Sequence, residues 1–297
     1  MSETARQRTW RIGETCHEFD GWPWLMGIVN VTPDSFSDGG DFAAVSDAVA
    51  RARDLADAGA AVIDIGGEST RPGATSVDVA EELRRVGPVV EAVVEAVDVP
   101  VSIDTTKAAV ARVAVEAGAT IVNDVSGLEA DPEMVETCIE LEVAVICMHR
   151  QGTPATMQEN PTYDDVVEDV AGYLERRLES LVAAGLMEDR IVLDPGIGFG
   201  KTAADNLALL SSIGRLQRSG RPVLVGHSRK RFLSKLLGRA VEERTAGTLG
   251  VAVALAEQGT DLIRVHDVGT TLDALVAWRA VRGGGAGSLA PWRSHHQ

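Results

Sequence analysis

The chain has 297 residues, of which 45% are hydrophobic and only 4% aromatic, a composition that suits one large α/β domain. Its formal net charge of −16 at pH 7 argues against nucleic acid or an anionic membrane surface as the main partner. No apolar run reaches the roughly 20 residues that a bilayer-spanning helix needs, and the charged N-terminus is unlike a signal peptide. Three scattered cysteines are too few for a disulfide framework, so a reducing cytoplasm is the expected location.

An alternation of apolar runs and amphipathic stretches begins at Trp24. The apolar runs, which indicate buried parallel strands, are 25–31, 62–66, 101–103, 121–122, 143–147, 191–193, 223–225 and 262–265. The predicted helices are 45–58, 79–96, 107–117, 133–141, 164–184, 205–217, 244–258 and 270–281. Because right-handed crossovers place every helix outside, eight such units predict a closed (β/α)8 barrel, the TIM barrel of the α/β class. A doubly wound open sheet, the alternative, would usually carry a glycine-rich nucleotide turn after its first strand, and residues 30–36 contain none.

The barrel is predicted to span residues 24–282 as a single domain. Residues 1–23 are a polar N-terminal lead, and 1–20 are expected to be either frayed or a small hairpin that covers one end of the barrel. Residues 283–297 are rich in glycine and are predicted to form a flexible C-terminal tail.

Polar residues stand at the carboxyl end of every predicted strand, where the strands of a barrel converge on one mouth. They are Asn30, Asp64, Asp104, Asn123 with Asp124, His149, Asp194, the segment 226–230, and Arg264 with His266. Any one of them could cap the following helix, and for Asp104 or Asp124 alone that interpretation is the stronger. The complete ring indicates an active-site face.

The segment 191–201 organises this pattern, since it joins a β-branched run to an acid and three alternating glycines. Asp194 is predicted to stand at the end of a buried strand, where an acid without partners would be costly. Glycine residues at 196, 198 and 200 let the backbone approach a flat ligand closely or adopt a positive φ. On this segment alone, Asp194 reads equally well as a binding acid or as a cap for the next turn.

Two chemical sets are present among these residues. Asp104, Asn123 and Asp194 suit a flat heterocycle with adjacent N–H groups, because a carboxylate can accept two parallel hydrogen bonds from an amino-amide edge. The second set is cationic or potentially cationic, and in an acidic protein it suggests a bound anion such as diphosphate. Its members are Arg71, Lys230, Arg264 and His266.

A set of motifs in one order resembles the dihydropteroate synthase family, the folate-pathway enzymes that sulfonamides inhibit. The motifs are MGIVNVTPDSFSDGG (26–40), GGESTRPGA (66–74), SIDTTK (102–107), IVNDVSG (121–127), LDPGIGFGK (193–201), GHSRK (226–230) and RVHDV (264–268). The resemblance implies a (β/α)8 barrel, usually a homodimer packed through its outer helices. It also implies an enzyme that joins 6-hydroxymethyl-7,8-dihydropterin diphosphate to p-aminobenzoate, giving 7,8-dihydropteroate and diphosphate with the help of Mg²⁺.

The resemblance further implies a role for each matching position, and the residues expected to act most directly in catalysis are Lys230, Arg71, Asp104 and Asp194. The pterin would be bound deep in the barrel by Asp104, Asn123, Asp194 and Lys230, with Asp64 and Phe199 lining the same site. The diphosphate would be bound by Asn30, Arg71, Arg264 and His266, and Asn30 would also bind the Mg²⁺. The p-aminobenzoate would be framed by Thr70, Pro72, Ser228, Phe36 and Phe199.

Two positions depart from the pattern of the family. Arg150 stands where a methionine often packs on the pterin, and it is expected either to stack on the ring or to turn outward. Arg231 stands where the family commonly has a small polar residue. Both changes bear on substrate affinity more than on reaction type.

Three alternatives stay open. A methyltetrahydrofolate:corrinoid methyltransferase would share the pterin acids but has no use for the TPDSF and STRPG loops. A Schiff-base aldolase would need Lys230 desolvated and of depressed pKa. A paralogue that binds pterins without turnover is the third, and the intact Arg71, Lys230 and Asp194 count against it.

Overall fold

The computed structural model describes residues 7–31, 40–69, 76–152, 156–157 and 161–283, and within them eight parallel strands form one sheet. The strands are β3 (Trp24–Asn30), β4 (Val62–Gly66), β5 (Val101–Asp104), β6 (Ile121–Asp124), β7 (Ala144–Met148), β8 (Ile191–Asp194), β9 (Leu224–Gly226) and β10 (Leu262–Val265). Their order is β8-β7-β6-β5-β4-β3-β10-β9, and a parallel bridge from Leu193 to Val223 joins the two ends. The predicted closed barrel is therefore confirmed.

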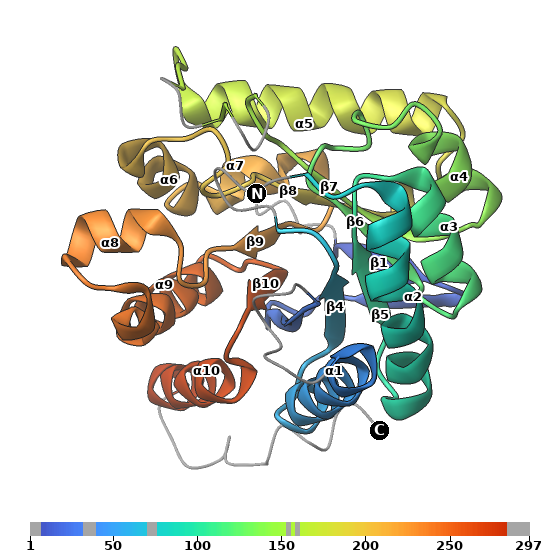
Figure 1. Ribbon diagram of the computed structural model, residues 1–297. Coiled ribbons are helices and arrows are strands. Elements are labelled where there is room, and N and C mark those ends of the chain that lie inside the picture. Colours follow the sequence, from blue (N-terminus) through green and yellow to red (C-terminus); the bar gives the residue numbers. More distant parts are fainter. Residues whose placement is uncertain (1–6, 32–39, 70–75, 153–155, 158–160, 284–297) are drawn as a thin grey trace.

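The helices surround this barrel in chain order, as Figure 1 shows. They are α1 (Gly40–Asp57), α2 (Val79–Ala96), α3 (Ala108–Glu116), α4 (Met134–Glu140), α5 (Val166–Ala183), α6 (Ala203–Leu210), α7 (Ile213–Leu216), α8 (Arg231–Leu237), α9 (Thr245–Glu257) and α10 (Val268–Arg282). Among the described residues, no helix has the length and apolar character that crossing a bilayer requires.

Two helical features differ from the sequence-based expectation. The predicted helix 205–217 is broken into α6 and α7, and the side chain of Gln258 bonds the backbone at the break, donating to Leu210 O at 2.8 Å and accepting from Ile213 N at 3.4 Å. This tertiary contact carries no local sequence signal. The short helix α8, which begins five residues after β9 ends, is absent from the sequence-based prediction.

The interior of the barrel is arranged in layers because alternate side chains along each strand face the barrel axis. An apolar layer lies toward the amino ends of the strands and contains Met26, Val62, Ile121, Ile146, Val192, Leu224 and Leu262. Two residues further along the same strands come Asp64, Asn123, Asp194 and Arg264, which place polar groups in the next layer toward the mouth. The period of two thus puts a charged layer directly on an apolar one.

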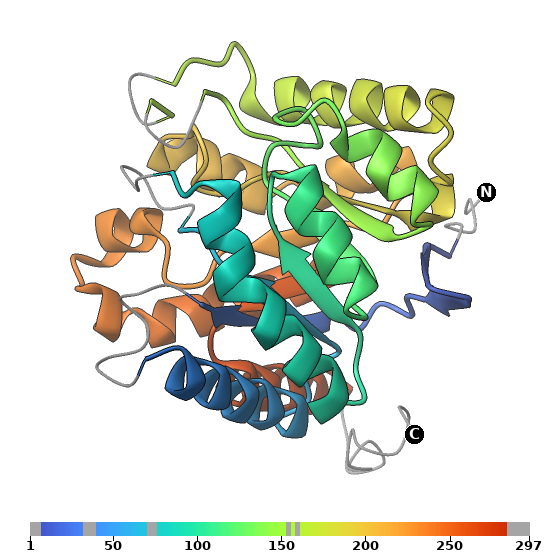
Figure 2. The same ribbon diagram turned by 45° about the vertical axis from the view of Figure 1, so that its right-hand side comes forward.

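An N-terminal hairpin covers the end of the barrel opposite the mouth. Strands β1 (Thr9–Ile12) and β2 (Thr15–Glu18) pair in antiparallel fashion, and Figure 2 shows the hairpin in blue, apart from the ring of helices. Trp10, Ile12 and Phe19 are buried in the same cluster as the apolar layer of the barrel. Of the two expectations for residues 1–20, the hairpin is the one that the described residues show.

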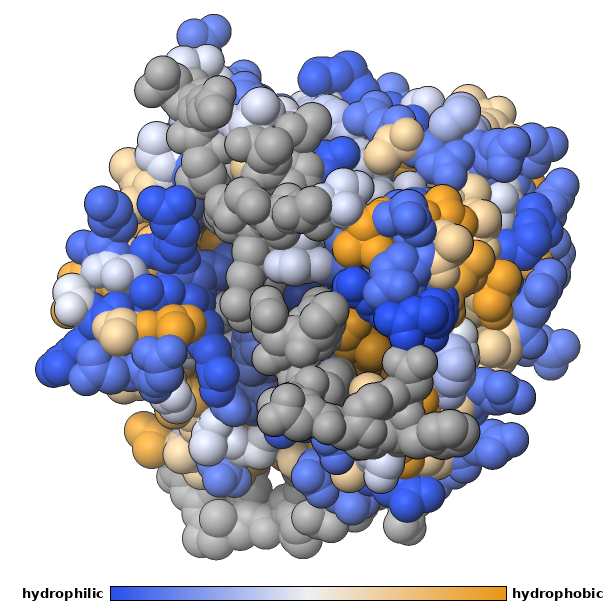
Figure 3. Space-filling model, in the orientation of Figure 1, coloured by the Kyte–Doolittle hydropathy of each residue, from blue (hydrophilic) through white to orange (hydrophobic). Residues whose placement is uncertain are grey.

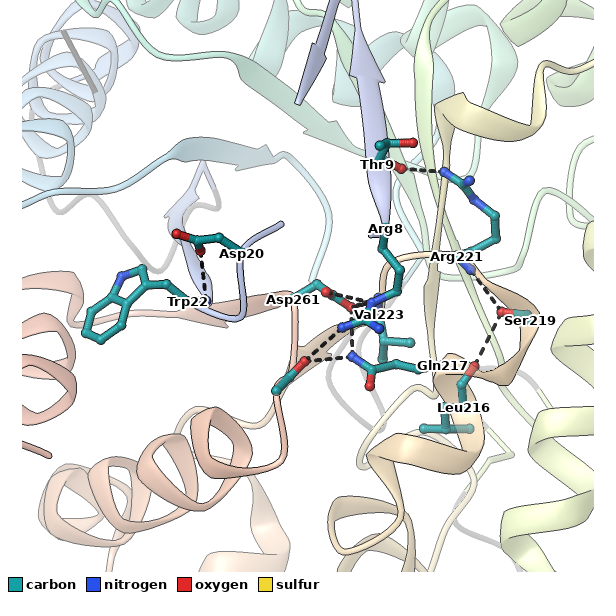
Figure 4. A network of polar contacts seen from close by, with 11 residues as sticks. Arg8, Thr9, Asp20, Trp22, Leu216, Gln217, Ser219, Arg221, Val223 and Asp261 are labelled. Carbon is teal, nitrogen blue, oxygen red and sulfur yellow. Dashed lines mark hydrogen bonds and ion pairs between the residues drawn. The ribbon is translucent and has the colours of Figure 1, made fainter. Parts of the chain in front are cut away.

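Asp261, at the start of β10, fixes this hairpin to the barrel (Figure 4). Its carboxylate accepts hydrogen bonds from Arg8 Nε at 2.9 and 3.0 Å, from Gln217 Nε2 at 2.9 Å and from Val223 N at 2.9 Å. The backbone oxygen of Asp261 accepts from Trp24 N at 2.8 Å. One buried acid therefore joins the N-terminal lead to the point where the barrel closes.

We expect Asp261→Ala to lower the free energy of unfolding by about 3–5 kcal/mol, because it leaves the buried donors of this network without an acceptor. Arg8→Ala removes one partly exposed donor and should cost less. Urea unfolding of both variants checks this ranking, and equal losses would contradict it.

Candidate active site

The centre of the site is an ion-pair network between Arg264 on β10 and acids from two other strands. Arg264 Nε donates to Asp64 Oδ2 at 2.6 Å, and its Nη2 donates to Asp104 Oδ2 at 2.9 Å. Asn123 Nδ2 donates to the same Asp64 oxygen at 3.2 Å. Burial opposes the charge of Arg264, yet the two carboxylates raise its pKa overall, so the guanidinium stays cationic.

Several buried oxygens in this layer have no hydrogen-bond partner among the described residues. They are Asp64 Oδ1, Asp104 Oδ1 and Ser102 Oγ. Burial raises the pKa of Asp104 from 3.8 to about 7, although the charge of Arg264 opposes this. Leaving a buried acceptor unpaired costs about 1–3 kcal/mol, so a ligand with neighbouring N–H groups would gain by binding here.

Asp194 ends β8 beneath the glycine segment. Its Oδ1 accepts from Gly196 N at 2.7 Å, so the acid also orders the following turn. Burial raises the pKa of Asp194, and the charge of Lys230 opposes that shift. The two interpretations of Asp194 from the sequence, binding acid and turn cap, are therefore compatible in one residue.

The glycines of this segment serve mainly to pack protein against protein. A Cβ on Gly196 would lie 1.9 Å from His149 O, and a Cβ on Gly200 would lie 2.5 Å from Gln151 O. Only Gly198 faces a site residue, since its Cβ would lie 3.0 Å from Lys230 Cδ. Of the two expectations for these glycines, the positive φ is confirmed at all three, and at Gly196 and Gly200 the close approach is to the neighbouring loop.

Lys230 lies over the ring of Phe199. Its Nζ is 4.4 Å from the ring centroid and donates to Ile197 O. Burial lowers the pKa of Lys230 to about 8, with Asp194 acting in the opposite direction. This depressed pKa meets the electrostatic condition of the Schiff-base alternative, so that alternative has to be judged on other grounds.

The outer part of the site carries Asn30, Ser228 and His266. Asn30 is exposed at the end of β3. His266 Nδ1 lies 2.9 Å from Ser228 Oγ. Arg264, which the resemblance grouped with His266 as a diphosphate ligand, bonds Asp64 and Asp104 in the inner layer and is 20% exposed.

Four predicted site residues, Phe36, Thr70, Arg71 and Pro72, lie outside the described residues. Of the other strand-end residues, Asp124 orders the following turn, because its Oδ1 accepts from Ser126 N and Ser126 Oγ, both at 2.6 Å, and its Oδ2 has no partner among the described residues. Burial raises the pKa of Asp124 to about 6, and the Ser126 bonds and the charge of Arg150 act against it.

Two residues of the site were missed from the sequence. Ser102 stands two residues before Asp104, so the strand period already places it on the inner face. Lys201 ends the glycine segment and is 3% exposed, packed behind Asp194 and Phe199. Its place in the segment 191–201 was the only sequence signal.

Acids, an amide and cations that converge at the carboxyl ends of a closed parallel barrel define an enzyme of the (β/α)8 class that acts on small molecules. The model of the family described as "Pterin binding enzyme" matches residues 26–266. The dihydropteroate synthase of Escherichia coli (strain K12) is 46% identical over 253 residues, which cover 85% of this chain and 89% of that protein. The chain therefore belongs to the dihydropteroate synthase family of pterin-binding enzymes.

Solved structures agree with this assignment. The Xanthomonas albilineans dihydropteroate synthase with 4-aminobenzoic acid has a TM-score of 0.87 and 46% identity, covering 94% of this chain and 100% of that one. The same enzyme in complex with 7,8-dihydropteroate has a TM-score of 0.83 and 44% identity, covering 93% and 100%. The Schiff-base alternative thereby loses its support.

The pKa of Asp104 makes the stability of the ligand-free protein depend on pH. The folded state holds this acid's pKa near 7 instead of 3.8, so its contribution to stability is complete below pH 3.8 and is lost as pH rises through 7. We expect Asp104→Asn, which is neutral throughout, to raise Tm at pH 8 and to raise it less at pH 5. Thermal unfolding at both values checks this, with the exposed Asp98→Asn as control. A gain that is larger at pH 5 would contradict the assignment.

Proposed function

We propose that this protein is a dihydropteroate synthase. It joins 6-hydroxymethyl-7,8-dihydropterin diphosphate to p-aminobenzoate and releases 7,8-dihydropteroate and diphosphate, a transferase reaction of folate biosynthesis. The single observation that carries the site assignment is the pair of buried, unpartnered oxygens Asp64 Oδ1 and Asp104 Oδ1 beside Arg264. Both oxygens are hydrogen-bond acceptors in the innermost polar layer, and a ligand with N–H groups could donate to them.

The pterin ring would lie in that layer with its amino-amide edge toward the acids. Asp104, Asp194 and Asn123 supply acceptors on different strands, and Lys230 supplies a donor from the next loop. Because these groups come from a rigid barrel, their spacing is set before the substrate arrives. A flat ring with adjacent N–H groups suits this arrangement better than a flexible chain does.

The diphosphate would lie toward the mouth, near His266 and Asn30, with Arg71 from outside the described residues. Arg264 borders both regions, since it is held by Asp64 and Asp104 and is itself 20% exposed. Its guanidinium can exchange one carboxylate for a phosphate oxygen, since both accept its paired donors. That exchange would leave the freed carboxylate to the pterin.

Mg²⁺ is part of the proposal as an ion that arrives with the diphosphate. The described residues hold no group of three or more His, Cys, Asp and Glu side chains suited to a resident metal. Asn30 offers one amide oxygen, and Mg²⁺ is commonly held by one or two protein groups together with substrate phosphates and water. When bound, the ion would neutralise charge on the leaving diphosphate.

The chemistry asks the protein for position and electrostatics. The bond from the exocyclic pterin carbon to the diphosphate oxygen breaks, the bond to the amine nitrogen forms, and the amine loses a proton. The electron-rich pterin stabilises positive charge on that carbon, and the amine of p-aminobenzoate is neutral at pH 7, so no strong general base is required. Cations near the leaving group and exclusion of water account for the acceleration.

The p-aminobenzoate would lie at the outer side of Lys230 and Phe199, near Ser228. Phe199 is 9% exposed and presents its ring to the Lys230 ammonium, which fixes one wall of this region. Thr70, Pro72 and Phe36 are proposed for the remaining walls. A sulfonamide that resembles p-aminobenzoate would compete for the same place.

The two remaining alternatives are disfavoured on different grounds. The corrinoid methyltransferase has no use for the TPDSF and STRPG loops that this chain carries. The non-catalytic paralogue is disfavoured because the chain retains Arg71, Lys230 and Asp194. Only turnover separates that paralogue from the enzyme.

Assembly and location complete the proposal. Exposed apolar residues gather on α8 and the adjoining 3₁₀ turn η4 (Val241–Glu243): Leu236, Leu237 and Val241 are 58%, 43% and 41% exposed. Figure 3 shows orange surface in this region, on the left. We place a homodimer interface on these outer helices and the enzyme in the cytoplasm, where its three free thiols would stay reduced.

For the interface, we expect light scattering to give the mass of two chains. Leu236→Glu should shift this mass toward one chain, because it buries a charge against apolar side chains. An unchanged mass would place the interface elsewhere.

The reaction is tested by diphosphate release. We expect release to require p-aminobenzoate, the pterin diphosphate and Mg²⁺ together, and to stop when the ion is chelated. Asp194→Asn should weaken pterin binding at least tenfold while Tm changes little, since it replaces a charged acceptor by a neutral one in the same volume. Pterin binding by calorimetry without any diphosphate release would favour the non-catalytic paralogue.

A further inference from the structure

Lys201 is a buried lysine to which the proposed reaction assigns no role. It follows the glycine segment after β8 and is 3% exposed. Its Nζ lies 2.9 Å from His149 Nδ1, 3.0 Å from Phe199 O and 3.5 Å from His149 O. These three acceptors match the three N–H donors of an ammonium group, which is how a buried lysine charge is tolerated.

These contacts join two loops of the site. His149 follows β7, and Phe199 lies in the loop between β8 and α6. The same two loops meet through Gly196, whose Cα faces His149 O, and through Tyr163 Oη, which donates to Gly200 O at 2.7 Å. Lys201 is therefore at the centre of the packing that sets the position of Phe199.

Lys201 also acts on Asp194 through its charge. Burial lowers the pKa of Lys201 to about 7, Asp194 and Asp205 act against that shift, and Lys230 adds to it. In return, the charge of Lys201 opposes the burial that raises the pKa of Asp194. The pKa of His149 is lowered to about 3 by burial and by Lys201, so this neighbour stays neutral.

The geometry of the neutral imidazole is consistent with this arrangement. When Lys201 is in its ammonium form, its third N–H donates to Nδ1, and the single proton of the neutral His149 ring is then on Nε2. The ring also packs edge-on against Tyr173 with centroids 4.8 Å apart, which fixes the acceptor in place. Lys201 thus finds its partners already oriented.

We propose that Lys201 is a positioning residue for the synthase reaction: it holds the Phe199 loop at the wall of the site through His149 and the Phe199 backbone, and it places a positive charge near Asp194, whose backbone oxygen accepts from His149 N at 2.9 Å. It contacts neither substrate. The inference rests on the proposed function for its kinetic consequence, whereas its effect on Asp194 can be observed in the ligand-free protein.

Two variants separate the charge from the hydrogen bonds. Lys201→Met removes both, and Lys201→Gln removes the charge while keeping an amide that can donate to Phe199 O. Lys235→Met is the matched control, since Lys235 is exposed on α8. Tm is measured for each, and Lys201→Gln serves if the methionine variant does not fold.

The first readout is the protonation of Asp194 in the ligand-free protein, followed by ¹³C NMR of labelled aspartate and assigned with Asp194→Asn. We expect the midpoint to move upward by about one pH unit in both Lys201 variants, equivalent to the loss of one favourable charge interaction. It should stay unchanged in Lys235→Met. This readout does not depend on turnover, so it tests the inference even if the wild type fails to release diphosphate.

The second readout is kinetic. As the pH is lowered, Asp194 becomes protonated and pterin binding should weaken. We expect this weakening to begin at a higher pH in both Lys201 variants than in the wild type. The KM for p-aminobenzoate should rise more in Lys201→Met than in Lys201→Gln, because only the methionine variant loses the hydrogen bond to Phe199 O. A lowered Tm with an unmoved Asp194 midpoint and an unchanged KM would reduce Lys201 to a structural residue and overturn the proposal.

Discussion

Burying carboxylates inside a barrel is the constraint on which the rest of this structure depends. Asp64, Asp104 and Asp194 face the interior from β4, β5 and β8 and are at most 7% exposed. Removing an ionised carboxylate from water costs several kcal/mol unless a cation and hydrogen bonds compensate it. Arg264 supplies this compensation for the first two acids, and Lys230 with Lys201 supplies it for the third.

This compensation is incomplete, and the shortfall is what a ligand can use. The unpartnered oxygens of Asp64 and Asp104 and the raised pKa of Asp104 are costs to the folded protein without substrate. Proteins commonly accept lower stability at sites that bind or react. In the proposed function, a ring with matching N–H groups would supply these hydrogen bonds, so the cost of burying the acids and the affinity for the ring would have one origin.

Much of this arrangement could be predicted from the sequence. The alternation of apolar runs and helical stretches gave the barrel, and because side chains alternate along a strand, Asp64, Asp104 and Asp194 could be placed at one mouth. The position of Arg264 could not, because a long side chain from β10 can reach either the diphosphate region or the acids across the barrel. Distance across the barrel is a tertiary property that no local pattern carries.

The same reason explains the other differences. Gln258, from a distant part of the chain, bonds the backbone where the predicted helix is interrupted, and the carbonyl of His149, just after β7, leaves no room for a side chain at position 196. Asp124 has the same sequence context as the other strand-end acids, yet it follows Asn123 by one residue and so faces away from the axis. Whether a strand-end residue faces the barrel axis was therefore predicted better by its odd or even place along the strand than by its charge.

The N-terminal hairpin has a consequence for traffic through the enzyme. Trp10 and Phe19 pack on the apolar layer of the barrel, so the described residues close that end and leave the polar layer to open at the other. In the proposed reaction, a pterin in the innermost polar layer would then have to enter before p-aminobenzoate lies above it. The same geometry would require the joined product to leave through the mouth by which its parts arrived.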